Sequence, residues 1–325
     1  MNTSSPLRHL RNALVASSLL CTASISQATT YSNLVVFGDS LSDPGNALAL
    51  TGGLFPPAPY SGTFSNGPTA VQYLATSLGV SAQNYAVGGA MTNTQNYLAL
   101  DIPSLAPTLG NTGIASQIAS WSPSASTASS LFVIWGGPND FSYNFGLAAA
   151  GVSVDFNAVV AQTIGNIASG ITTLAAQGAH DFLIPYLPDL GLTPRASANG
   201  AGFASFASML SSAYNAGLDA TLDSLETGLG LTIHRFDTAQ YMQGIIADPA
   251  SVGLSNVTTP CIAAGAATIA GGCAGYLYFD DIHPTTYAHA LIGAEFAQAV
   301  PEPASVLMML GGLGLMGLLA RRRLN

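Results

Sequence analysis

The feature of this 325-residue sequence that most restricts its fold is an alternation of short apolar runs with amphipathic helical patterns. The apolar runs are rich in Val, Ile, Leu and Phe, a composition that suits strands buried on both faces of a sheet. They are "NLVVF" (33–37), "LFVIW" (131–135), "DFLIPY" (181–186) and "LTIHRF" (231–236). The weaker run "VSAQNYAV" (80–87) predicts a fifth strand.

Helical patterns lie between these runs. The clearest has apolar side chains spaced by four, three, four and three residues from Val160 to Leu174, and Gly178 follows it as a stop signal. Further patterns cover 203–227, 68–79 and 285–298, and the Ser-rich stretch 122–130 reads as a loop. Strands alternating with helices predict parallel crossovers and therefore a doubly wound α/β sheet.

Both ends of the chain indicate export. Residues 1–28 combine Arg8 and Arg11 with an apolar stretch and end in small residues, which predicts a signal peptide cleaved before Thr29. Near the other end, the apolar run 304–320 has the minimum length for a membrane span, and three arginines follow it. Such arginines stay cytoplasmic, so we expect 29–300 to be one exported domain and 301–325 to be an anchor segment.

The charge of the expected mature domain excludes one class of partner. All seven basic residues are arginines, and only Arg195 and Arg235 fall within 29–300, against 15 acidic residues, for a net charge of −13. Binding nucleic acid requires Lys or Arg to neutralise phosphates, so we expect no nucleic-acid partner. Anionic membrane surfaces are disfavoured for the same reason.

Two cysteines remain in this domain, Cys261 and Cys273, on either side of a Gly/Ala-rich loop. In an exported protein they are expected to form a disulfide, the alternative being two free thiols. No Cys/His spacing indicates zinc. The sequence does not predict an oligomeric state.

The chemistry-bearing residues follow the predicted strands, where α/β sheets bind their ligands. "FGDSLSD" (37–43) ends the first strand and contains Ser40, a candidate nucleophile that needs a base and a group to orient that base. "DDIHP" (280–284) places Asp280 three residues before His283, so one turn of chain brings them together, whereas Asp281 should point elsewhere. We expect Pro284 to be the first residue of the following helix.

Acyl transfer on such a serine also needs hydrogen-bond donors for the oxyanion of the tetrahedral intermediate. The backbone of Ser40, the Gly88-Gly89 turn and the amide of Asn139 in "GGPND" are the candidates. Alternatives remain open: Ser40 could cap a helix, and Asn139 could satisfy turn backbone. His234 and His289 are competing bases, but their places in a strand and a helix favour structural roles.

"FGDSLSDPGN", "NYAVGGA", "GGPND" and "DDIHPT" together resemble the four ordered blocks of the SGNH/GDSL hydrolase family, in particular its exported esterases, lipases and phospholipase-like enzymes. The resemblance implies a flavodoxin-like sheet of about five parallel strands with helices on both faces. It makes Ser40 the nucleophile and a backbone donor, Asn139 the side-chain donor, His283 the base and Asp280 its orienting partner.

The same resemblance places the remaining donor five residues after Asn84, at Gly89, with Gly88 as the alternative. It gives Asp39 the role of bracing the turn. The C-terminal Pro-Glu-Pro, apolar run and arginines are similar to a PEP-CTERM sorting signal. This implies processing by an exosortase and a place in the cell envelope, at the surface or in the extracellular matrix, with transient anchoring by the C-terminal segment.

The function expected from these residues is an exported serine esterase that uses no cofactor and no metal. Its ester substrate is a lipid or a short-chain acyl ester, or alternatively an O-acetyl group on extracellular polysaccharide. A non-catalytic surface protein that retains the fold is the alternative from another class. Tyr60 and Phe64, in the Pro/Gly-rich loop 52–68, are expected either to line the acyl pocket or to pack within the loop.

Overall fold

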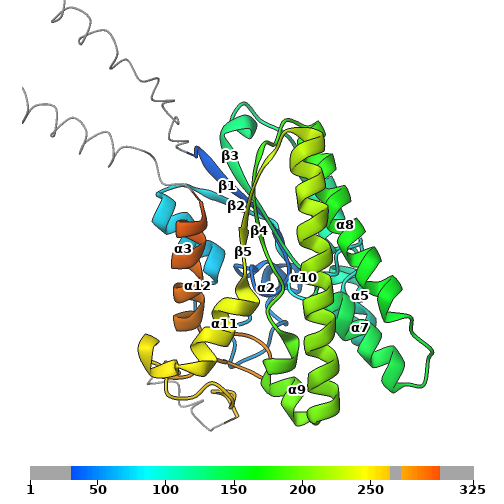
Figure 1. The fold of residues 1–325 in the computed structure, drawn as a ribbon, viewed down its shortest axis with the longest axis vertical. Coiled ribbons are helices and arrows are strands. Elements are labelled where there is room, and N and C mark those ends of the chain that lie inside the picture. The colour runs from blue at the N-terminus through cyan, green and yellow to red at the C-terminus, as the bar shows by residue number, and fades with distance from the viewer. Residues whose placement is uncertain (1–30, 264–271, 301–325) are drawn as a thin grey trace, which may run out of the picture. The chain divides into compact units, whose positions relative to one another are not determined.

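The computed structural model describes residues 31–263 and 272–300, and in this part of the chain the strands form one sheet (Figure 1). The sheet has five parallel strands in the order β2-β1-β3-β4-β5. The strands are β1 (Asn33–Gly38), β2 (Ala82–Asn84), β3 (Ser130–Trp135), β4 (Asp181–Pro185) and β5 (Thr232–Phe236). This order is that of flavodoxin-like folds, with a switch point between β1 and β3.

Helices cover both faces of the sheet (Figure 1). On one face lie α8 (Phe156–Ala176) and α10 (Ala201–Leu229), and on the other α3 (Ala70–Leu78), α11 (Thr238–Ala247) and α12 (Thr286–Ala299). Successive strand residues point to opposite faces. Val35 and Phe37 therefore belong to the core beneath α8 and α10, whereas Leu34 and Val36 belong to the core beneath α3 and α12.

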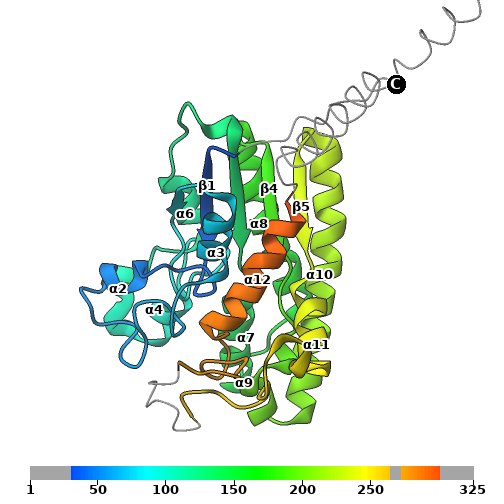
Figure 2. The same cartoon turned by 90° about the vertical axis from the view of Figure 1, so that its left-hand side faces the viewer.

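Shorter elements lie in the connections between the strands and the long helices. They are α2 (Asn46–Leu50), α4 (Tyr97–Asp101), α5 (Ala106–Leu109), α6 (Ile114–Ser120), α7 (Pro138–Ala149) and α9 (Pro194–Ala198), with short 3₁₀ turns at Pro103–Leu105, Thr127–Ser129, Leu190–Leu192 and Pro249–Val252. Figure 2 shows α2 and α4 together below the end of β1. A small apolar cluster that includes Ala47 and Ala99 holds these two helices.

The structure confirms the predicted α/β class and the five strands. The weak fifth strand is only three residues long and is largely exposed at the sheet edge. Pro284 is not the first residue of α12, as the sequence suggested. It precedes Thr285, whose hydroxyl accepts the Ala288 N–H and caps a helix that begins at Thr286.

The predicted loop 122–130 contains the 3₁₀ turn Thr127–Ser129, and its last residue starts β3. Cys261 and Cys273 are joined by a disulfide. The expected signal peptide and anchor lie outside the described residues. Within the described residues, α8 is long and apolar enough to cross a membrane. Its Ile167, Ile171 and Leu174 are nevertheless buried in the core, as in a core helix of a globular domain.

Candidate active site

Ser40 lies in a tight turn at the carboxyl end of β1. Gly38 precedes the turn, and a Cβ there would lie 2.7 Å from the Trp135 carbonyl oxygen, so the close approach of β1 to β3 requires glycine. The Asp39 carboxylate accepts the Leu41 N–H at 3.0 Å, which is the bracing role expected for it. Burial raises the pKa of Asp39 to about 7. The turn therefore places Ser40 at the carboxyl-terminal end of the central strand β1.

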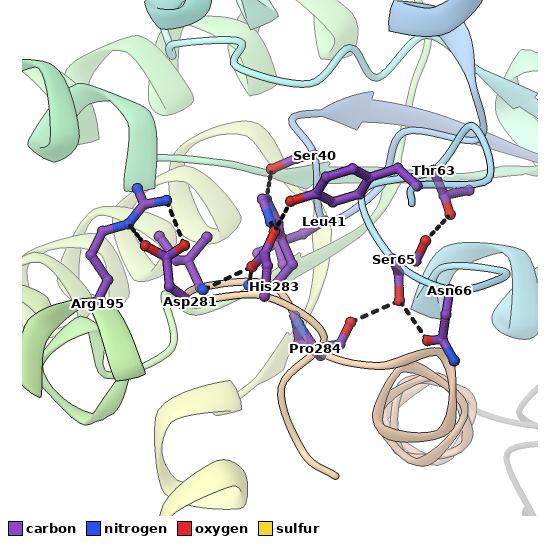
Figure 3. Close-up of polar contacts among 12 residues, drawn as sticks. Ser40, Leu41, Thr63, Ser65, Asn66, Arg195, Asp281, His283 and Pro284 are labelled. Atoms are coloured by element: carbon purple, nitrogen blue, oxygen red, sulfur yellow. Dashed lines mark hydrogen bonds and ion pairs between the residues drawn. The ribbon is translucent and has the colours of Figure 1, made fainter. Parts of the chain in front are cut away.

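The structure brings Ser40, His283 and Asp280 into one hydrogen-bonded chain, and Figure 3 shows Ser40 beside His283. Ser40 Oγ lies 2.7 Å from His283 Nε2, and His283 Nδ1 lies 2.6 Å from Asp280 Oδ2. Because a carboxylate only accepts hydrogen bonds, Nδ1 carries the imidazole proton and Nε2 accepts from the Ser40 hydroxyl. This is the arrangement that makes a serine nucleophilic.

Asp280 is fixed by donors on both of its oxygens. Oδ1 accepts the backbone N–H groups of Ile282 and His283, at 2.8 and 2.6 Å. Oδ2 accepts from the Tyr60 hydroxyl at 2.6 Å as well as from His283. Burial by itself would raise the pKa of Asp280, but the charge of His283 and these hydrogen bonds outweigh it and hold that pKa well below its usual range. The carboxyl is therefore ionised at neutral pH.

Asp281 points away from this chain, as its spacing predicted. Its carboxylate accepts from Arg195 Nε and Nη2 at 2.9 and 2.8 Å, and its carbonyl oxygen accepts the Arg195 N–H at 2.8 Å (Figure 3). The ion pair ties α9 to the segment that carries His283. Both side chains are substantially exposed, so solvent screens the pair and its contribution to stability is small.

The Gly88-Gly89 turn has one N–H group that is not used within the described residues. The Gly88 N–H donates to Asp43 Oδ2 at 2.7 Å, so it is not available to a ligand. The N–H groups of Gly89 and Ser40 have no acceptor among residues 31–263 and 272–300. Gly89 has a φ of +80°, and a Cβ there would lie 2.5 Å from Asn96 Oδ1. Glycine is therefore required to aim this N–H.

Asn139 is the second residue of α7, next to the same turn. Its amide donates one hydrogen bond to the Ala90 carbonyl oxygen at 3.0 Å, as the turn-satisfying alternative expected. An amide has two N–H bonds, so the second is left for a ligand. Gly89, Asn139 and Ser40 all line one cavity.

Buried carboxylates connect the loops that supply these donors. Asp43 accepts the N–H groups of Gly45, Asn46, Ala47 and Gly88, which joins the turn after β1 to the turn after β2. Asp140 accepts the N–H and hydroxyl of Thr92, at 2.9 and 2.7 Å, which joins the start of α7 to the same loop. Burial raises the pKa of Asp140 to about 6.

The two competing histidines lie elsewhere. His289, on α12, is fully buried, and its Nδ1 accepts the Ala70 N–H at 3.2 Å. Burial lowers its pKa to about 3, so it stays neutral. His234, on β5, contacts the Tyr31 hydroxyl at 3.4 Å. Neither reaches Ser40, and both serve the structure.

A mainly apolar cavity opens beside Ser40. Its walls include core side chains from the sheet face that α3, α11 and α12 cover, among them Trp135, Met242, Tyr278 and Ile292. Phe64 lines the cavity, which is one of the two alternatives expected for it. Tyr60 does not line the cavity, and its hydroxyl donates to Asp280 instead. Arg195 and His283 are the basic side chains that line it, and the phenols of Tyr97 and Tyr278 are its other ionisable groups. In the part of the chain that the structure describes, no group of three or more His, Cys, Asp or Glu side chains is arranged to hold a metal ion.

Comparison with known proteins agrees with this geometry. Residues 34–296 match the GDSL-like lipase/acylhydrolase family, and residues 299–323 match the PEP-CTERM protein-sorting motif. The chain belongs to the GDSL-like lipase/acylhydrolase family. It is accordingly an ester-hydrolysing serine hydrolase, and its C-terminal motif marks it for export and sorting.

Individual relatives of this GDSL-family chain are distant. It is 25% identical to the thermolabile hemolysin of Vibrio parahaemolyticus serotype O3:K6 (strain RIMD 2210633), over 84% of this chain and 65% of that protein. It is 24% identical to a phosphatidylcholine-sterol acyltransferase of Aeromonas hydrophila, over 86% of this chain and 90% of that one. The chain thus spans just under two thirds of the hemolysin. A solved phospholipase A1 from Streptomyces albidoflavus NA297 aligns over 83% of this chain and 99% of its own, with 17% identity and a TM-score of 0.41.

Proposed function

We propose that this protein is an exported serine esterase that hydrolyses carboxylic esters of lipids or of short acyl chains through an acyl-enzyme on Ser40. The observation that carries the proposal is the continuous hydrogen-bonded chain from Ser40 Oγ through His283 to Asp280, with distances of 2.7 and 2.6 Å. Ser40 and His283 line a cavity with mainly apolar walls.

The first half of the reaction acylates the enzyme. As Ser40 Oγ attacks the ester carbonyl carbon, His283 Nε2 takes the hydroxyl proton, and the carbonyl oxygen becomes an oxyanion. The N–H groups of Ser40 and Gly89 and the amide of Asn139 donate to that oxygen. The tetrahedral intermediate then collapses, the bond to the leaving oxygen breaks, and His283 gives its proton to the leaving alcohol.

The second half releases the acid. Water attacks the acyl carbonyl while His283 takes a proton from it, and the bond between the acyl carbon and Ser40 Oγ breaks. The proton then returns to Ser40. Throughout, ionised Asp280 keeps the Nδ1 proton in place and stabilises the imidazolium that forms twice in the cycle.

The walls of the cavity favour an apolar acyl group as the bound part of the substrate. Trp135, Met242 and Ile292 belong to the buried core beneath α12, so an acyl chain in the cavity leaves water for a hydrocarbon surface. An acetyl group would contact little of this surface. The observation therefore favours lipid or short-chain acyl esters over acetylated polysaccharide.

We also propose that export begins with a signal peptide at 1–28, that 29–300 is the hydrolase domain, and that 301–325 is a sorting segment. The match of 299–323 to the PEP-CTERM motif supports processing by an exosortase. The proposed location is the cell envelope, the surface or the extracellular matrix.

A series of p-nitrophenyl esters from acetate to palmitate tests the proposal on the purified protein, with Ser40→Ala as the reference. We expect kcat/KM to rise beyond acetate and to be abolished in Ser40→Ala. Activity confined to acetate would redirect the proposal to O-acetyl esters. Equal inertness of the folded wild type and variant would favour a non-catalytic surface protein.

A further inference from the structure

The loop Tyr60–Asn66 lies along the segment Asp280–Thr286 and contacts it at four positions in the same chain order. The Tyr60 hydroxyl donates to Asp280, and the Phe64 ring packs on the His283 imidazole with ring centroids 5.5 Å apart. The Ser65 hydroxyl donates to the Pro284 carbonyl oxygen, and the Asn66 side-chain oxygen accepts the Thr286 N–H. Figure 3 shows Ser65 and Asn66 beside Pro284. These contacts join positions about 220 residues apart in sequence.

Tyr60 makes the one contact in this set that reaches the carboxylate. Its hydroxyl lies 2.6 Å from Asp280 Oδ2, the same oxygen that accepts His283 Nδ1–H at 2.6 Å. A carboxylate cannot donate, so the tyrosine hydroxyl donates. Burial, and next the negative charge of Asp280, raise the pKa of Tyr60 far above its ordinary value, so the phenol keeps its proton throughout the working pH range.

The Tyr60 ring packs against buried residues near the disulfide. It packs edge-on against Phe279 with ring centroids 5.3 Å apart, and Phe279 is buried with the Cys261–Cys273 disulfide. The backbone N–H groups of Cys261 and Ile262 donate to the carbonyl oxygens of Tyr278 and Phe279, each at 3.0 Å. The disulfide and Ile262 thus support both the ring of Tyr60 and the segment 278–279 that leads into Asp280.

We propose that Tyr60 is a positioning residue of ester hydrolysis, which holds the Asp280 carboxylate in the orientation that His283 requires and shares its negative charge. The inference rests on the proposed function, because it assumes that His283 is the base for Ser40. Without the phenol, Oδ2 would keep His283 as its donor in a site where Asp280 is only 5% exposed. More of the carboxylate charge would then fall on the imidazole.

Other ionisable groups also face the Asp280–His283 pair. Arg195 from α9 interacts electrostatically with Asp280, Asp39 and His289 interact with His283, and Asp281 interacts with Tyr60. The charges among these groups act on the pair in the wild type and in any Tyr60 variant alike, and His289 is neutral in both. A difference between the pH profiles of the wild type and the Tyr60 variant therefore reports the effect of the Tyr60 hydroxyl alone.

The test is Tyr60→Phe, which removes the hydroxyl and keeps the ring on Phe279. We expect kcat on a p-nitrophenyl ester to fall roughly tenfold, since a hydrogen bond to a charged group is lost. KM should stay within about twofold of the wild-type value, because Tyr60 does not line the cavity. The acid limb of the kcat/KM profile should move to higher pH by roughly half a unit.

Tyr276→Phe is the matched control. Tyr276 packs in the same disulfide cluster, and its hydroxyl has no hydrogen-bond partner within 31–263 and 272–300. Removing this hydroxyl should leave kcat, KM and the pH profile as in the wild type. Near-ultraviolet circular dichroism shows whether each variant is folded.

A readout that needs no turnover is the downfield proton resonance of His283 Nδ1–H. It should move further downfield in Tyr60→Phe, because the His283–Asp280 bond no longer competes for Oδ2. An unchanged resonance and pH profile would overturn the role of Tyr60, and so would loss of the fold, which would make the hydroxyl structural. Retained esterase activity in Ser40→Ala would instead refute the proposed function itself.

Discussion

Asp43 allows a quantitative test of how the candidate oxyanion site is held together. Its buried carboxylate accepts four backbone N–H groups. Oδ1 accepts from Gly45 and Asn46 at 2.7 and 2.5 Å, and Oδ2 accepts from Ala47 and Gly88 at 3.1 and 2.7 Å. In Asp43→Asn one oxygen becomes an NH₂ group, so two of these N–H groups lose their acceptor whichever way the amide turns.

The expected cost follows from that count. Each backbone N–H left without an acceptor in a buried site costs about 1–3 kcal/mol, or roughly 4 kcal/mol for the pair. Removing a buried charge offsets part of this, and the pKa of Asp43 is indeed raised by burial despite its four donors. We therefore expect Asp43→Asn to lower the free energy of unfolding by about 3 kcal/mol, out of a typical 5–15 kcal/mol.

Asp140→Asn is the matched comparison. Asp140 is also buried, but its two partners are the N–H and the hydroxyl of Thr92. A hydroxyl can accept as well as donate, so the new amide keeps both contacts and only the Thr92 hydroxyl proton loses its acceptor, since Asn166 Nδ2 is itself a donor to that oxygen. We therefore expect a cost of about 1–2 kcal/mol. Urea unfolding followed by circular dichroism measures both variants. A cost for Asp43→Asn no larger than that for Asp140→Asn would refute the reasoning.

Three further predictions concern the reaction and the stability of the domain. Asn139→Ala should lower kcat by about 10²–10³-fold through loss of an oxyanion donor, and steady-state kinetics showing less than about a fivefold loss would remove Asn139 from that role. Asp280 has a depressed pKa when folded, so its contribution to stability is present above the unfolded value near 3.9 and is lost as pH falls through the folded value. Unfolding free energies measured from pH 5 downward should therefore fall less steeply in Asp280→Asn than in the wild type, and parallel curves would contradict this. Replacing both Cys261 and Cys273 by Ser should cost about 3 kcal/mol for a loop closed across 12 residues, as a lower midpoint of thermal unfolding, and an unchanged midpoint would argue against a stabilising disulfide.

The fold was predictable because its central strands, β1, β3 and β4, are buried on both faces. A continuous apolar run such as 131–135 is typical of a strand buried on both faces of a parallel sheet, and β3 is indeed buried at every position. The strand at the edge was the weakest prediction for the same reason, since Ala82–Asn84 is largely exposed and carries no such signal. The N-terminus of α12 was misplaced because Pro284 and the Thr285 cap both signal a helix start within two residues.

The candidate site was predictable where its residues follow strands or lie close in sequence. Ser40 follows β1, and Asp280 and His283 are three residues apart, so topology and spacing indicated a serine at the sheet's carboxyl edge and an Asp–His pair, whereas joining the two rested on the family resemblance. The choice of Gly89 over Gly88 needed the family resemblance, and the structure adds a physical reason in the bond from the Gly88 N–H to Asp43.

Contacts between loops could not be predicted. The Tyr60–Asp280 bond joins positions 220 residues apart, and the Asp140–Thr92 bonds join positions 48 apart. Loops lack the periodicity that reveals a buried face, so a lone Tyr or Asp in them gives no signal of its partner. Tyr60 was expected at most to line the pocket, because an aromatic ring in a loop suggests packing before it suggests a hydrogen bond.

The central claim is that Ser40 is a nucleophile activated by His283, and covalent labelling tests it most directly. The purified protein is treated with a fluorophosphonate, and the site is located by peptide mass spectrometry in the wild type, Ser40→Ala and His283→Ala. The account predicts a single adduct on Ser40 in the wild type, none in Ser40→Ala, and strongly slowed labelling in His283→Ala. An adduct on another serine, or no adduct on folded wild-type protein, would contradict it.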